Sequence, residues 1–203
     1  MDDLSKKALA KLKRDARLRP VILKVGPPVF HEYSRENLLA NLLAAIVSQQ
    51  LSGKVADVIY GRLGKLGGKG FPNPKRLIKH TDEELKAVGL SRAKMACIRD
   101  LAGAIVSRRL DLDALPALSD TEVEEVLVGI KGIGPWTAHM ALIFALRRPD
   151  VWPAADLGVR KALQVVLGLP ALPAIKEAET MGDPWRPYRS YACWYLWQLL
   201  DGK

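Results

Sequence analysis

Cysteine and histidine are scarce in this chain, which has two cysteines and three histidines among its 203 residues. This scarcity argues against an iron–sulfur cluster or a zinc finger. No apolar run approaches the roughly 18 residues that indicate a membrane-spanning helix. The charged N-terminus also lacks the central apolar stretch of a secretory signal. These absences argue against metal-centred redox chemistry and favour a cytoplasmic protein with unbridged thiols at Cys97 and Cys193.

Acidic residues are outnumbered: 22 Asp and Glu stand against 31 Lys and Arg, which gives a net charge of +9. Such an excess favours a polyanionic partner over a neutral metabolite. With 49% hydrophobic and 26% charged residues, the composition is typical of a folded globular chain. The length allows one domain or two small lobes. Nucleic acid is therefore the first candidate partner, and membrane surfaces are the alternative polyanion.

Strand-like alternation is also lacking, and nearly every segment has the helical period. We expect an all-α fold of about eight to ten helices joined by short loops, in one lobe or two. Residues 38–47 are apolar nearly all round and predict a buried central helix. Capping boxes at 81–84 and 119–122 each open a helix, and the glycines of 64–70 indicate a turn. Further helices are expected over 53–63, 92–109, 136–146, 159–167 and 190–200.

A glycine-rich hairpin is predicted between two of these helices, where I-K-G-I-G-P-W-T-A occupies 130–138. Gly129, Gly132 and Gly134 permit close backbone approach, and Pro135 suits the first turn of a helix. Such a helix-hairpin-helix aims backbone amides outward, where they can hold a phosphate without reading a base. A plain turn between core helices is the alternative, but the net charge favours DNA binding. The residues expected at the phosphate are Lys131, Gly132, Gly134 and Thr137.

The hairpin resembles the helix-hairpin-helix DNA glycosylase superfamily, and within it the 3-methyladenine DNA glycosylase II branch. Further stretches carry the same resemblance, which covers about residues 20–200: IVSQQLSGK (46–54), GLSRAK (89–94), VWPAADLG (151–158) and WRPYRSYA (185–192). It implies one glycosylase unit over 1–203, with the hairpin at about 127–138 and, if two lobes form, the active site in their cleft. Residues 1–20 are expected to be mobile or packed on the second lobe. Longer members begin with a β-rich domain, for which this chain has no room.

The resemblance implies a monofunctional enzyme of base excision repair. It would flip an alkylated base such as 3-methyladenine or 7-methylguanine out of duplex DNA and hydrolyse the N-glycosidic bond, leaving an abasic site. It would act as a monomer in the cytoplasm, at the nucleoid if bacterial, with no required cofactor. Relatives hold Na⁺ or K⁺ through hairpin carbonyls, here those of Val128, Ile130 and Ile133. The alternatives are a glycosylase for uracil, hypoxanthine or an oxidised purine, and a non-catalytic DNA-binding domain.

Asp156 is the expected catalytic residue. Breaking the C1′–N bond places positive charge on the sugar, and a carboxylate fixed beside C1′ stabilises that charge. An aspartate just before a helix is also a common N-cap, and both roles can hold at once. Trp136 and Trp152 are expected to wall the pocket for a cationic base.

Gln50 matches the position of the side chain that relatives insert into the DNA stack, with Gln49 and Leu51 as neighbouring alternatives. Arg92, Lys94 and Arg160 are expected at flanking phosphates, although each could be an ordinary solvated charge. Trp185, Trp194 and Trp197 are assigned to packing, and His139 to the core.

Overall fold

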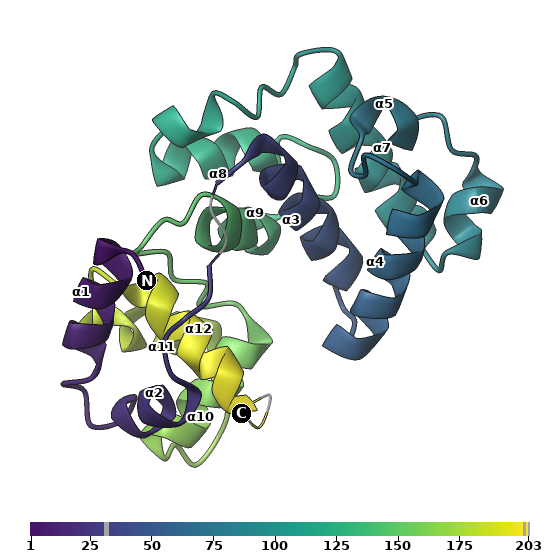
Figure 1. Ribbon diagram of the computed structural model, residues 1–203. Coiled ribbons are helices and arrows are strands. Elements are labelled where there is room, and N and C mark those ends of the chain that lie inside the picture. Colours follow the sequence, from purple (N-terminus) through teal and green to yellow (C-terminus); the bar gives the residue numbers. More distant parts are fainter. Residues whose placement is uncertain (31–32, 201, 203) are drawn as a thin grey trace. The chain divides into compact units, whose positions relative to one another are not determined.

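The computed structural model describes residues 1–30, 33–200 and 202, and within them all regular structure is helical (Figure 1). The all-α prediction is confirmed. The described residues form twelve α-helices, more than the eight to ten expected. The difference arises because short helices occupy segments where the pattern had not predicted any: α1 (Asp3–Leu12), α2 (Arg19–Val25), α5 (Pro74–Leu77) and α11 (Ile175–Met181).

The chain divides into two compact units. Unit 1 combines Met1–Phe30 with Arg147–Lys203, and unit 2 is the intervening His31–Leu146. The sequence pattern had left one lobe or two open. Helix α1 packs within unit 1, because Ala8 and Leu12 belong to the same buried cluster as Trp185 and Tyr195. In the described part of the chain, no helix combines the length and apolar surface needed to cross a membrane.

Unit 2 is built around α3 (Arg35–Ser48), as predicted from its apolar run. Ser34 caps this helix by accepting the backbone N–H of Asn37 at 3.0 Å. Leu38, Leu42 and Ile46 are completely buried, because α3 is surrounded by other helices of the unit. Its neighbours are α4 (Gly53–Gly67), α7 (Arg92–Val106), α9 (Pro135–Met140) and the π-helical segment η2 (Ala141–Ala145).

Both predicted capping boxes are present in unit 2, at the starts of α6 (Asp82–Ala87) and α8 (Asp120–Val128). Two details of the prediction are wrong. Helix α4 continues to Gly67, so the turn expected from Gly64 begins at Gly68, whose φ is 65°. The helix expected over 92–109 is also shorter, because α7 ends at Val106 and Ser107 is its C-cap.

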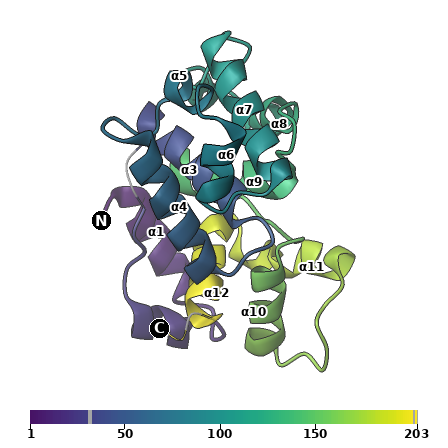
Figure 2. The ribbon, with the colours of Figure 1, turned by 90° about the vertical axis from the view of Figure 1, so that its right-hand side faces the viewer.

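Unit 1 is centred on α12 (Arg189–Leu200), which lies beside α10 (Leu157–Leu167) and also contacts α2 and η3 (Asp183–Trp185) (Figure 2). Residues from the two ends of the chain meet here. The Tyr195 hydroxyl donates to the Gly26 carbonyl at 2.8 Å, and the Trp185 indole N–H donates to Asp15 Oδ2 at 2.9 Å. These bonds fasten the N-terminal segment to α12 and η3, and α12 in turn packs beside α10.

Candidate active site

Asp156 is the N-cap of α10, at the end of the loop that follows Trp152. Its Oδ1 accepts the backbone N–H of Val159 at 2.7 Å, so the expected cap exists. The same oxygen accepts the indole N–H of Trp197 from α12 at 2.9 Å. Two donors from two helices therefore fix the orientation of this carboxylate.

Trp197 had been assigned to packing, and the structure gives it this additional role. The close approach of its ring leaves little room for a side chain at 158, since a Cβ there would lie 3.0 Å from Asp156 Oδ1 and 3.1 Å from Trp197 Cδ1. Cys193, one turn earlier on α12, is fully buried nearby. Burial first, and the negative charge of Asp156 second, raise the pKa of its thiol well above the usual range.

The hairpin lies in unit 2 between α8 and α9, and two different constraints hold its backbone. Gly132 has a φ of 86°, and a Cβ at this position would lie 2.9 Å from Cys97 Cβ. The backbone N–H of Lys131 donates to Asp100 Oδ2 at 2.7 Å, and this bond is the main cause of the lowered pKa of Asp100. Lys131 itself is exposed. The loop is thus anchored through its backbone while its cationic side chain remains at the surface.

Gly134 differs from Gly132, although both are hairpin glycines. It is the N-cap of α9 with an ordinary φ of −105°, and a Cβ added to it would meet no atom within 4 Å. The fold therefore leaves open space at this position, and glycine keeps the backbone accessible there.

The turn between α3 and α4 carries the three residues considered as the wedge. Gln49 is tied to the hairpin, since its Nε2 donates to Thr137 Oγ1 at 3.0 Å and to the Gly132 carbonyl at 3.2 Å. Gln50 is exposed in the left-handed region, with a φ of 58°. Leu51 is 39% exposed. Gln49 therefore positions the turn, and Gln50 stands at its tip.

The three cations expected at flanking phosphates have different surroundings. Arg92 is exposed at the start of α7. The Lys94 ammonium donates to the Val47 carbonyl at the end of α3 at 2.7 Å, and its burial lowers its pKa. Arg160 Nε donates to the Pro173 carbonyl at 2.8 Å. Lys94 and Arg160 thus stabilise the fold in the first place, whereas Arg92 has the exposure that a phosphate contact needs.

Trp136 and Trp152, the two expected pocket walls, lie in different units. Trp152 donates its indole N–H to the Ala178 carbonyl at 2.8 Å and meets Trp185 edge-on at 5.6 Å between ring centroids. A Cβ on Gly182 would lie 2.5 Å from its ring. These contacts give Trp152 a packing role in unit 1. His139 is only half buried and contacts Glu124 at 3.2 Å, so its assignment to an apolar core is wrong.

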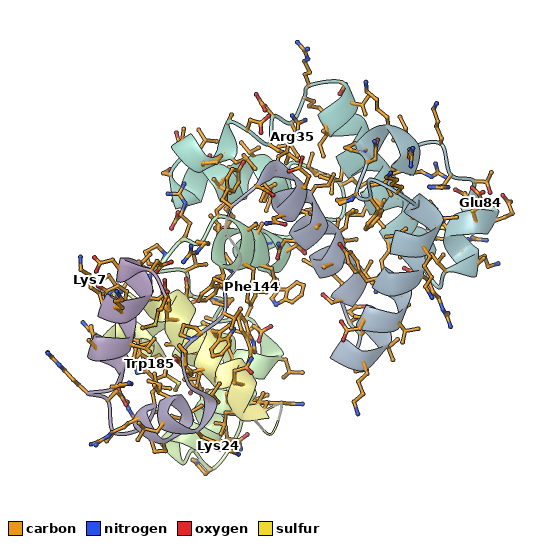
Figure 3. All side chains as sticks on the ribbon, viewed as in Figure 1. Lys7, Lys24, Arg35, Glu84, Phe144 and Trp185 are labelled. Carbon is orange, nitrogen blue, oxygen red and sulfur yellow. The ribbon has the colours of Figure 1, made fainter. Side chains whose placement is uncertain are left out.

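Trp136 lines a cavity of 270 Å³ within unit 2, together with side chains of α3, α4 and η2. Its aromatic walls are Trp136, Tyr60 and Phe144, and Figure 3 shows the Phe144 ring extending outward from its helical segment. Larger organic ligands usually occupy about 300–1,000 Å³, so this cavity suits a single planar ring system. Of these three aromatic residues, the sequence had predicted Trp136 alone as a pocket wall.

Comparison with known proteins places this geometry in a family. Residues 43–187 match the family described as HhH-GPD superfamily base excision DNA repair protein. DNA-3-methyladenine glycosylase 1 of Schizosaccharomyces pombe is 36% identical over 77% of this chain and 70% of its own length. The alkylbase DNA glycosidase-like protein of the same yeast is 30% identical over 91% and 88% of the two chains.

Among solved structures, the S. pombe 3-methyladenine DNA glycosylase in complex with abasic DNA matches with a TM-score of 0.88 and 32% identity. The match covers 95% of each chain. The family match over residues 43–187 includes the hairpin of unit 2 and the loop and helix around Asp156 in unit 1. The protein therefore belongs to the HhH-GPD superfamily of base excision DNA repair proteins.

Proposed function

We propose that the protein is a monofunctional DNA glycosylase that removes alkylated bases, of the 3-methyladenine and 7-methylguanine type, from duplex DNA. The observation that carries the proposal is the Asp156 carboxylate, which Val159 and Trp197 hold at the start of α10. The similarity to the two S. pombe 3-methyladenine DNA glycosylase matches described above supports the same substrate class. The net charge of +9 supports a DNA partner.

Asp156 acts on charge that appears only in the transition state. As the C1′–N bond breaks, its electron pair leaves with the base, and the sugar gains the positive charge that the base loses. A carboxylate already fixed beside C1′ stabilises this charge without reorganising. Water then bonds to C1′ and gives up a proton, which leaves an abasic sugar. A base that is cationic before cleavage leaves as a neutral molecule and needs little acid catalysis.

The hairpin and the α3–α4 turn bind and open the DNA in this proposal. Gly132, Gly134 and Thr137 supply backbone amides for a phosphate, and Lys131 adds its exposed charge. Gln50, at the tip of its turn, fills the space that the flipped nucleotide leaves. The enzyme acts as a monomer.

In this proposal the hairpin carbonyls hold a monovalent cation. Among the described residues, no hydrogen bond reaches the carbonyl oxygens of Val128 or Ile133. The Ile130 carbonyl accepts the Ile133 amide at 3.0 Å, and a carbonyl oxygen has a second lone pair for another partner. Na⁺ or K⁺ on these three oxygens would add positive charge next to a bound phosphate.

The nucleophile is water in this proposal. Superfamily members that also nick the strand carry a lysine two residues after the last hairpin glycine, and here Trp136 takes that position. An indole has no amine that could form a Schiff base with C1′.

The test is incubation with N-methylated duplex DNA, followed by chromatography of released bases and borohydride trapping of covalent adducts. We expect free 3-methyladenine and 7-methylguanine, strands that break only after alkali or heat, and no trapped adduct. A trapped adduct would refute the monofunctional mechanism. If DNA is bound but no base is released, the protein is a non-catalytic DNA-binding domain.

A further inference from the structure

The cavity beside Trp136 contains one carboxylate, Asp57 on α4. Asp57 lies three residues before Tyr60, so the two side chains share a face of the helix. The cavity therefore combines aromatic walls from α4, α9 and η2 with a negative charge.

The other polar side chains that line the cavity are engaged with backbone. Asn41 Nδ2 donates to the Asn37 carbonyl at 2.7 Å, and Ser48 Oγ donates to the Ala45 carbonyl at 3.0 Å. The Tyr60 hydroxyl donates to the Ala40 carbonyl at 3.3 Å, and burial raises its pKa, so it stays a neutral phenol. These groups add no net charge to the cavity.

Asp57 has no such engagement. Across residues 1–30, 33–200 and 202, no hydrogen bond or ion pair involves its carboxylate, and Lys54, one turn earlier, forms no ion pair with it. Its charge is therefore not neutralised by a protein partner and acts on whatever occupies the cavity.

We infer that Asp57 is a specificity-determining residue that makes this cavity favour positively charged, N-alkylated bases over neutral lesions of the same size. The inference rests on the proposed function for the identity of the occupant. Aromatic faces attract any flat ring but hold a cationic ring more strongly. A carboxylate in the same cavity adds a Coulombic attraction that only the cation feels.

The chemistry predicts where this preference appears in the kinetics. The base carries its charge in the ground state and loses it to the sugar in the transition state. Asp57 therefore stabilises the bound substrate more than the transition state. Its removal should raise KM for a cationic lesion about three- to tenfold, without lowering kcat, and should leave a neutral lesion such as hypoxanthine unaffected.

The variant Asp57→Asn removes the charge at an exposed position and preserves the shape of the side chain, so the fold should survive. Asp57→Glu retains the charge and should restore part of the preference. Glu83→Gln on α6 is the matched control, because it also removes one exposed negative charge from unit 2 but does not line this cavity.

Two readouts separate this inference from the proposed function. The first is KM and kcat for excision of 7-methylguanine and of hypoxanthine. The second does not depend on catalysis. Binding of 7-methylguanosine is compared with binding of guanosine by the quenching of tryptophan fluorescence, at a mildly acidic pH where the 7-methylguanosine ring is cationic. We expect the wild type and Glu83→Gln to bind the cationic nucleoside more tightly, and Asp57→Asn to lose about three- to tenfold of that preference.

An unchanged preference in Asp57→Asn, or a wild type without any preference, would overturn the inference. A wild type that prefers the cation but excises no base would instead refute the proposed function.

Discussion

Trp197 and Asp156 lie 41 positions apart, yet one hydrogen bond joins them. We predict that Trp197→Phe, which removes the donor but keeps an aromatic ring on α12, slows excision about tenfold, because the carboxylate loses a donor that fixes its orientation. DNA affinity should not change. Single-turnover rates measure the effect, with Trp194→Phe as the control on the same helix. Equal rates in both variants would show that the bond does not matter for catalysis.

Gln50 and Gln49 provide a matched pair for the wedge. Gln50→Ala should slow excision of a paired lesion more than of a mispaired one, because unstacking a paired base costs a few kcal/mol. Gln49→Ala should lower the melting temperature, because it removes two hydrogen bonds to the hairpin. Excision rates on both substrates and thermal unfolding measure these effects. If Gln50→Ala affects both lesions equally, Gln50 is not the wedge.

Residue roles were predictable where the sequence signal is local. Asp156 precedes a helix, so its cap could be inferred, and Gln50 lies in a short turn between two evident helices. The bond from Trp197, the packing of Trp152 and the position of Asp57 in a cavity depend on how helices pack. None of these has a sequence signature within one or two turns.

In the hairpin, the effects of replacing Gly132 and Gly134 should differ, because different physical constraints act at the two positions. Gly132→Ala should destabilise the protein by about 2 kcal/mol or more, because the left-handed backbone and Cys97 both oppose a Cβ. Gly134→Val should leave the melting temperature nearly unchanged and weaken binding to all duplexes about three- to tenfold, because its side chain would occupy the phosphate position. Thermal unfolding and binding to damaged and undamaged duplexes distinguish the two. A loss confined to damaged DNA would place Gly134 in the lesion pocket instead.

Helix boundaries were predicted correctly where the capping residues are strong, as at Thr81 and Ser119. The predicted end of α4 was wrong, because the glycines at 64 and 67 remain helical. Phe71 packs there, since a Cβ on Gly67 would lie 2.3 Å from its ring. Tertiary contact thus outweighs the low helix propensity of glycine.

At the scale of the whole molecule, the two ends of the chain form one unit, and Asp15 forms a hydrogen bond that connects them. Its carboxylate accepts bonds from Arg17 and from the Trp185 indole, and chiefly the Arg17 guanidinium lowers its pKa to about 2. The folded protein thus binds a proton here less readily than the unfolded chain, whose ordinary value is 3.8. This stabilisation is full above about pH 5 and is lost as the pH falls from about 4 to 2.

Asp15→Asn should therefore lower the free energy of unfolding by about 1–2 kcal/mol at neutral pH. The difference from the wild type should vanish towards pH 2. Denaturant unfolding at several pH values measures it. A difference that does not depend on pH would mean that the carboxylate charge contributes nothing. The contact between the two ends of the chain could not be predicted from the sequence, because Asp15 and Trp185 are 170 positions apart.

The central claim is that Asp156 stabilises the charge of a breaking N-glycosidic bond. The most direct test is single-turnover excision of 7-methylguanine from a duplex by wild type and by Asp156→Asn, with the bound fraction of DNA measured in the same samples. Asparagine still caps a helix and has the same shape, so folding and binding should persist. We expect excision to fall by at least about 100-fold while binding stays within about threefold. Excision at the wild-type rate would show that Asp156 is a helix cap alone and would contradict the mechanism.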